Sequence, residues 1–245
     1  MESDIRTATG EPLALDYFAA GVPAGRVFEM SLDDLDHVVS LAQITEVNRI
    51  AELCYIGLVS YFEAFCKDHA ASVVNIAPAL IENLRQAGYD TQVDAGRALE
   101  FGTGLRNKVG CLLMETYDFG NAKRINAIYN TLIKITPFSK DQIKTYDQIL
   151  RNRNLLVHHG GTYTSKYIEQ LGDQLLRISD AYWNSLVVKP EMLKEALSFL
   201  EDIARKTCRA SHAALSAYFR GAQVSLEPER EKALAYLLWD GRDSP

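Results

Sequence analysis

The sequence predicts a mainly α-helical protein, a helical bundle with one small β-hairpin inserted in it. Along most of the 245 residues, apolar side chains recur at spacings of three and four, the period that gives a helix one apolar face. Gly, Pro and capping residues divide this pattern into segments of helical length. With 47% hydrophobic residues, the chain can build the core of one large domain or two small ones.

The N-terminal part of the chain predicts an irregular lead-in. Gly and Pro are scattered through residues 1–30 and periodicity is weak there, apart from a short strand-like stretch at 27–30. Ser31 then stands just before acidic residues, which is typical of the start of a helix. We therefore expect a helical domain over 31–220, followed by a C-terminal helix and tail over 221–245.

The expected helices are bounded by recognisable signals. Pro137 ends one helix, and Ser139 followed by Gln142 is a capping box that starts the next. Gly160 and Gly161 end that helix, because glycine readily adopts the left-handed conformation found at helix C-termini. The expected helices are 47–70, 78–88, 109–113, 121–135, 139–159, 190–219 and 227–239.

Two stretches of the helical domain depart from the helical pattern. Residues 174–178 and 183–188 are strand-like and flank a polar turn, so they predict a small β-hairpin within 173–188. The glycines of 102–110 invite comparison with a phosphate-binding loop. However, no Gly-Lys-Ser/Thr follows them and no buried strand precedes them. We therefore interpret 102–110 as a break between helices.

Charge and cysteine content exclude several classes of protein. The net charge of -6 and a pI near 5.4 argue against a broad nucleic-acid-coating surface, although a small basic cleft is compatible with them. Apolar runs fall far short of the ~20 residues that span a bilayer, and the N-terminus lacks the pattern of a signal peptide. The cysteines at 54, 66, 111 and 208 form no C-x-x-C pair. We therefore expect reduced thiols in a cytoplasmic protein without membrane association, metal or cofactor.

The most informative stretch is Arg153-Asn154-Leu155-Leu156-Val157-His158. Arg and His at this spacing are expected about 0.3 times by chance in a chain of this composition. Requiring Asn directly after the Arg lowers the expectation to about 0.01 on the same count. The stretch also lies at the end of an expected helix, just before two glycines. The Asn at position 154 and the location at a helix end therefore distinguish the Arg153–His158 spacing from a chance pair.

The run from Arg153 to Gly161 resembles the R-N-x-x-V-H-x-G-G form of the HEPN superfamily, and Tyr61 to Phe65 resembles, less specifically, the first long helix of those proteins. The resemblance covers about residues 45–210 of the chain. It implies an HEPN-like helical bundle that forms a homodimer and acts as a metal-independent endoribonuclease in bacterial defence, toxin–antitoxin systems or stress control. RNA, and an antitoxin or regulatory protein, are the partners it implies. The matching catalytic positions are Arg153, Asn154 and His158, in a site where two copies of the motif face each other.

These residue types suit cleavage of RNA without a metal ion. Internal cleavage requires the 2′-hydroxyl to lose a proton, the leaving 5′-oxygen to gain one, and the negative charge at phosphorus to be stabilised. Histidine titrates near neutral pH and can act as base or acid. Arginine stays charged and offers forked donors to phosphate oxygens. The expected products are a 2′,3′-cyclic phosphate and a 5′-hydroxyl.

Helix geometry adds Arg151, and its place in the motif adds His159, as substrate-binding candidates. Arg153 and His158 lie about 140° apart around a regular helix, whereas Arg151, Asn154 and His158 share one stripe at i, i+3 and i+7. Arg151 is therefore a second candidate for the phosphate contact, with a solvated arginine as the alternative. His159 is either a further base or a helix-end histidine that interacts with the dipole. Arg153 shares its stripe with apolar residues, so it should have a partner.

Two other functions compete with the ribonuclease. A non-catalytic HEPN domain that binds RNA, a nucleotide or a partner protein is motivated by the acidic pI and by the lack of an attached effector domain. A structural helical scaffold is the third, with the Arg-Asn-His set closing a helix end or a dimer seam through hydrogen bonds. The remaining isolated histidines are interpreted as surface or hydrogen-bonded side chains; they are His37, His69 and His212.

Overall fold

The computed structural model describes residues 12–41, 49–171 and 185–242, and these are mainly α-helical, as the sequence predicts. Within the described ranges, no helix combines the length and the apolar character needed to cross a membrane. The helices are α1 (Ala24–Leu41), α2 (Arg49–Ile76), α3 (Ile81–Gln86), α4 (Ala95–Glu100), α5 (Val109–Met114), α6 (Ala122–Ile133), α7 (Lys140–His159), α8 (Ser165–Leu171), α9 (Pro190–Gly221) and α10 (Pro228–Tyr236), with 3-10 turns η2 (Ala14–Tyr17), η3 (Pro78–Leu80) and η4 (Gly102–Asn107).

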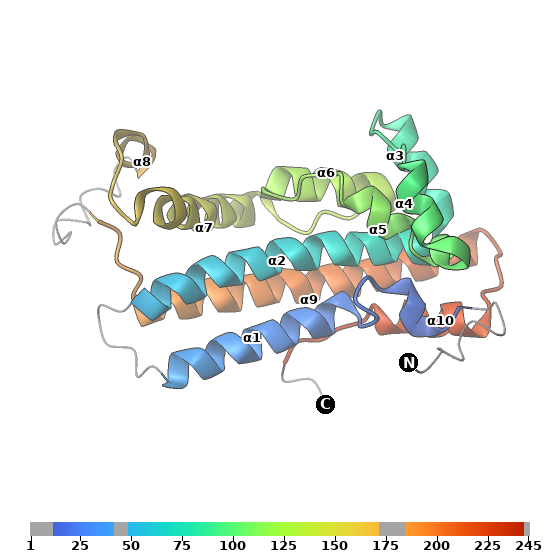
Figure 1. The fold of residues 1–245 in the computed structure, drawn as a ribbon, viewed down its shortest axis with the longest axis horizontal. Helices are drawn as coiled ribbons and strands as arrows, with labels where there is room; N and C mark the ends of the chain where they lie inside the picture. Colours follow the sequence, from blue (N-terminus) through green and yellow to red (C-terminus); the bar gives the residue numbers. More distant parts are fainter. Residues whose placement is uncertain (1–11, 42–48, 172–184, 243–245) are drawn as a thin grey trace.

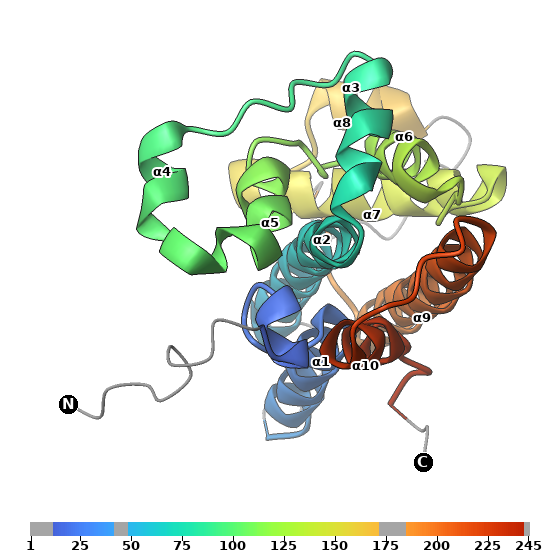
Figure 2. The same ribbon diagram turned by 90° about the vertical axis from the view of Figure 1, so that its right-hand side faces the viewer.

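Helix α2 lies at the centre of the molecule. It contacts α1, α5, α7 and α9, and the end-on view of Figure 2 places it among its neighbours. Figure 1 shows α9 alongside α2, with α6 and α7 following one another on one side and α1 on the other. The residues from His69 to Ile76 are all buried, which is expected of a helix that is covered on every side.

The face that α2 buries differs in part from its apolar periodicity. Leu58 and Phe65 are buried as the spacing indicates, but Leu53 is 67% exposed and Tyr61 is 44% exposed. Phe62, next to Tyr61, is fully buried instead. Because several helices pack on α2, the side that it buries is decided by those neighbours and not by its own pattern alone.

Helix α1 begins at Ala24, which corrects the predicted lead-in over 1–30 and the short strand at 27–30. Phe28 and Leu32, one helical turn apart, are both buried. The prediction failed because a run of four residues fits a strand and a buried helix equally well when no longer period is visible.

The C-terminal segment packs back on α1. The Trp239 side chain is buried, and its ring lies 6.3 Å from the ring of Phe28 in an edge-on arrangement. Gly25 permits this approach, since a Cβ atom there would lie 2.7 Å from the Cβ of Trp239. Residues 221–242, expected as a helix and tail following the helical domain, thus contribute to the same core.

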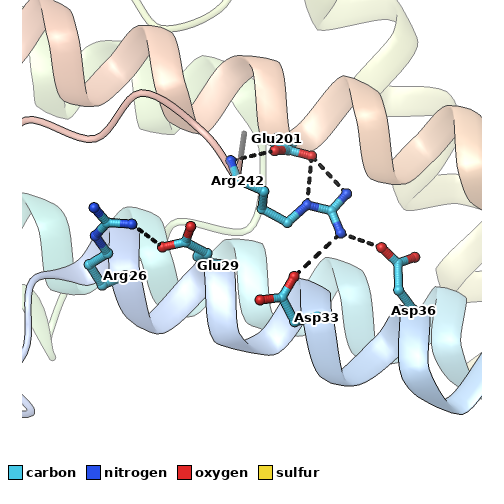
Figure 3. A network of polar contacts seen from close by, with 6 residues as sticks. All are labelled: Arg26, Glu29, Asp33, Asp36, Glu201 and Arg242. Carbon is cyan, nitrogen blue, oxygen red and sulfur yellow. Dashed lines mark hydrogen bonds and ion pairs between the residues drawn. The ribbon is translucent and has the colours of Figure 1, made fainter. Parts of the chain in front are cut away.

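Arg242 fastens this segment to α1 and α9 (Figure 3). Its Nη2 donates to Glu201 of α9 at 2.9 Å, and its Nη1 donates to Asp36 of α1. Asp33 lies 3.7 Å from the same Nη1 atom. Burial acts to lower the pKa of Arg242, but the hydrogen bonds with Glu201 and Asp36 outweigh it and raise that pKa. The guanidinium therefore stays charged and joins three segments.

Most of the predicted β-hairpin at 173–188 lies outside the described residues, which end at 171 and resume at 185. The part that is described pairs with the turn after α7. Ser185 forms an isolated antiparallel bridge with Thr162, and the Leu186 amide donates to the Gly161 carbonyl at 2.8 Å. The chain that enters α9 is thus tied to the end of α7.

Candidate functional site

Helix α7 carries the Arg-Asn-His motif, and both of its ends form as the sequence predicts. At the start, the Gln142 amide donates to Ser139 Oγ at 3.3 Å and the Ser139 amide donates to Gln142 Oε1 at 3.0 Å, which completes the capping box. At the other end, Gly160 and Gly161 adopt φ angles of 56° and 86°. In this left-handed region side chains are strained, so the two glycines stop the helix directly after His159.

A pocket of about 260 Å³ lies between the last turns of α7 and helix α8. Arg151, Asn154 and His158 all line it, as expected for residues on one helical stripe. Arg153 is not among the lining residues. Those that line the pocket are Arg151, Asn154, Leu155, His158, His159, Thr164, Lys166, Tyr167 and Gln170.

Arg153 points instead to α2. Its Nη2 atom lies 2.6 Å from Glu63 Oε1, and its Nη1 donates to Asn154 Oδ1 at 2.9 Å. The two ion-paired side chains are 21% and 25% exposed. Burial raises the pKa of Glu63, and the Arg153 guanidinium offsets part of that rise. This supplies the partner that an arginine on an apolar stripe was expected to have.

The pocket combines cationic and imidazole groups. Arg151 and Lys166 line it together with His158 and His159, both of which are exposed. No Asp or Glu is among the described residues that line it. Arg151 donates through Nη2 to Gln148 Oε1 at 2.6 Å and forms no ion pair with a described carboxylate. A chain of net charge -6 therefore presents a local basic site, which favours an anion.

A buried amide, Asn152, joins the wall of the pocket to the core. Its Oδ1 accepts hydrogen bonds from the Tyr167 hydroxyl at 2.7 Å and from Gln148 Nε2 at 2.8 Å. Its Nδ2 lies 3.4 Å from the Tyr55 hydroxyl of α2. Burial, followed by the neighbouring Tyr163, raises the pKa of Tyr167 to about 12, so the phenol keeps its proton and donates. Helix α8 is thus held against α7.

Sequence reasoning missed Asn152, Lys166 and Tyr167. A signal for Asn152 was present, because it interrupts the apolar stripe between Ile149 and Leu156 at i, i+3 and i+7. A polar residue on such a stripe is normally hydrogen-bonded inside the protein. Lys166 carries no such signal. It belongs to α8, which lines the pocket only because the turn after α7 brings the chain back to that helix.

The other singled-out histidines lie elsewhere. His37 is exposed on α1, and His212 lines a separate pocket at the end of α9. His69 is buried, with Nδ1 3.0 Å from the Tyr129 hydroxyl and Nε2 without a partner in the described structure. Burial lowers the pKa of His69 to about 3. In the ranges that the structure covers, no group of three or more His, Cys, Asp or Glu side chains is placed to hold a metal ion.

Comparisons with models of protein families, with curated proteins and with solved structures give no match. The likeness to HEPN proteins therefore depends on the sequence motif of α7 alone.

Proposed function

We propose that this protein is an HEPN-type, metal-independent endoribonuclease that cleaves RNA by attack of the 2′-hydroxyl. The observation that carries the proposal is the convergence of Arg151, His158, His159 and Lys166 on one pocket without an acidic lining residue among those described. Such a pocket attracts a phosphodiester and offers it both proton transfer and charge stabilisation.

The residues take separate roles in the cleavage. His158, in its neutral form, accepts the proton of the 2′-hydroxyl while the 2′-oxygen forms a bond to phosphorus. The bond from phosphorus to the 5′-oxygen breaks, and an imidazolium donates the proton that this oxygen needs. In the proposed dimer His158 of the second copy is suited to that role, and His159, which lines the same pocket, is a further candidate for it. Arg151 and Lys166 bind the phosphate oxygens, and the products are a 2′,3′-cyclic phosphate and a 5′-hydroxyl.

Within this proposal Arg153 stabilises the packing of α7 on α2 and does not contact phosphate. Its Nη2 and Nη1 atoms are occupied by Glu63 and Asn154. The phosphate contact that the motif assigns to Arg153 passes to Arg151, which lines the pocket and has no described carboxylate partner. Asn154 is exposed at the rim, where it can donate to the RNA backbone.

A homodimer with the site at its interface belongs to the same proposal, as do an RNA substrate and an antitoxin or regulatory partner in defence or stress control. Val157, directly before His158, is 47% exposed, and an apolar residue in that position can pack against a second copy. We expect Val157→Lys to shift the sedimentation of the protein towards the monomer and to lower cleavage. Val224→Lys, at an equally exposed valine far along the chain, should do neither.

The direct test is incubation of the pure protein with labelled single-stranded RNA in the presence of EDTA. We expect His158→Ala to reduce cleavage roughly 10²- to 10⁴-fold, the range for loss of a general acid or base. His37→Ala, which removes an exposed histidine of α1, is the matched control and should cleave like the wild type. Equal cleavage by His158→Ala and wild type would contradict the proposal.

The ion pair between Arg153 and Glu63 keeps the motif arginine out of the pocket, which is also compatible with one alternative, a non-catalytic HEPN domain that binds RNA, a nucleotide or a partner protein. In that case the motif arginine serves only to hold two helices together. RNA binding that depends on Arg151 and is accompanied by no cleavage would favour this alternative. EDTA-resistant cleavage that disappears in His158→Ala would exclude it.

A further inference from the structure

A second pocket, of about 410 Å³, opens between α2, α7 and α9. We propose that it binds one unpaired base of the RNA, next to the phosphate held in the first pocket. This inference depends on the proposed function for its substrate class, single-stranded RNA. The lining residues are Tyr55, Lys144, Thr145, Gln148, Ile149, Arg151, Met192, Glu195, Ala196 and Phe199.

Arg151 joins the two pockets, because it lines both of them. Lys144, Arg151 and His158 follow one another at seven-residue steps along α7, so they lie close to one stripe and about 10 Å apart. Lys144 and Arg151 line the second pocket, and Arg151 and His158 line the first. A single-stranded RNA whose backbone follows this stripe therefore passes Lys144, Arg151 and His158 in turn, so that a cation or an imidazole lies beside it at each of these positions.

The second pocket has the surface that a base requires. Met192 and Phe199 of α9 and Ile149 of α7 offer apolar contact to a flat ring, while Gln148 and Glu195 offer polar groups to its edge. The volume lies within the range of roughly 300–1,000 Å³ that is usual for small-molecule sites. Bases inside a duplex are stacked and paired, so only an unpaired nucleotide can enter.

The Gln148 side chain is held in place before any ligand binds. Gln148 Oε1 accepts from Arg151 at 2.6 Å, and Gln148 Nε2 donates to Asn152 at 2.8 Å. One lone pair of Gln148 Oε1 therefore remains for a ligand, while its amide group also reaches the Tyr167 hydroxyl. Because Asn152 also accepts from Tyr167 of the first pocket, both pockets share one hydrogen-bonded support.

Glu195 decides which occupant fits. It is the one carboxylate among the described residues that line this pocket, where it offers a hydrogen-bond acceptor beside the cations Lys144 and Arg151. A carboxylate accepts hydrogen bonds from an amino group, which cytosine, adenine and guanine carry. Uracil offers only its N3–H, which lies between two carbonyl oxygens that repel a carboxylate. The geometry points to a base with an exocyclic amino group, and hence to discrimination against uracil.

The test measures binding of short 2′-methoxy oligonucleotides, which lack the attacking hydroxyl, by fluorescence anisotropy. We expect oligocytidylate to bind about 10-fold more tightly than oligouridylate, and Glu195→Gln to remove most of that difference. Thr145→Trp, which places an indole at the rim, should weaken oligocytidylate binding about 10-fold. The controls are Glu191→Gln and Ser198→Trp, exposed positions of α9 that do not line the pocket. They should bind both oligonucleotides as the wild type does.

The outcomes separate this inference from the ribonuclease. If His158-dependent cleavage is present but Thr145→Trp and Glu195→Gln bind both oligonucleotides like the wild type, the base site is wrong and the ribonuclease stands. If cleavage is absent but Thr145→Trp and Glu195→Gln change binding as expected, the base site stands. Equal binding of oligocytidylate and oligouridylate by the wild type, or binding of neither, overturns the base site.

Discussion

Two arginines two residues apart on α7 have different environments, and replacing each with glutamine should have opposite consequences. Arg153→Gln removes the partner of a carboxylate that is 25% exposed, whereas Arg151→Gln removes a guanidinium with no described carboxylate partner. We therefore expect Arg153→Gln to lower stability with cleavage retained, and Arg151→Gln to lower cleavage with stability retained.

The size of each effect follows from these contacts. Exposed ion pairs contribute about 0.2–1 kcal/mol, and breaking a buried pair costs about 3–5 kcal/mol. The pair of Arg153 and Glu63, about a fifth to a quarter exposed, falls between these limits, so we expect a loss of about 2 kcal/mol. For a chain of this size that corresponds to a fall in Tm of roughly 4–8 °C. Removing one phosphate-binding donor, as in Arg151→Gln, should reduce cleavage by about 10²-fold.

The assays are thermal unfolding and cleavage of labelled RNA at a temperature well below the Tm of every variant. Glu63→Gln combined with Arg153→Gln tests the ion pair directly, because the double variant should be less destabilised than the sum of the single variants. The reasoning is refuted if Arg153→Gln abolishes cleavage at unchanged Tm while Arg151→Gln cleaves like the wild type.

Three further predictions concern stability. The folded pKa of His69, about 3, lies below its unfolded value of 6.5, so the free energy of unfolding should fall as pH falls from 6.5 towards 3. Between pH 6.5 and 5 the free energy of unfolding should fall by about 2 kcal/mol because of His69. Urea titrations of the His69→Phe variant should show no such contribution to the pH dependence. Gly110→Ala should destabilise the protein by roughly 1–3 kcal/mol, because the added Cβ would meet the Ala71 carbonyl oxygen. A Tm equal to that of the wild type would contradict the close contact of α5 with α2. Arg242→Ala leaves Glu201, 20% exposed, without its ion-pair partner, and proteolysis should then cut the C-terminal segment faster. An unchanged rate would show that the segment is held without Arg242, by Trp239 and by the ion pair of Asp240 with Arg209.

Local signals predicted α7 and its ends well. The capping box, the two glycines and the apolar spacing act within a few residues, so their effect does not depend on distant neighbours. The stripe through Arg151, Asn154 and His158 was also visible, since helical spacing alone places these side chains on one side.

Non-local contacts limited the rest of the prediction. The first turns of α1 pack against Trp239, more than 200 positions away in the chain, and no local pattern indicates that contact. The glycines of 102–110 were interpreted as a break, and η4 does precede α5 there, but Gly110 lies inside α5 and packs on α2. The ion-pair partner of Arg153 is Glu63, which lies on α2. Lys166 lines the pocket because the turn after α7 brings α8 back to it.

The sequence by itself determined that the chain is helical, that a helix ends at Gly160, and that Arg, Asn and His side chains gather on its last turns. Periodicity and capping are properties of neighbouring residues, so they can be worked out along the chain. Only the tertiary structure decided which arginine lines the pocket and which one joins two helices. That choice depends on Glu63 of α2 and on helix α8, which the fold brings against different residues of α7.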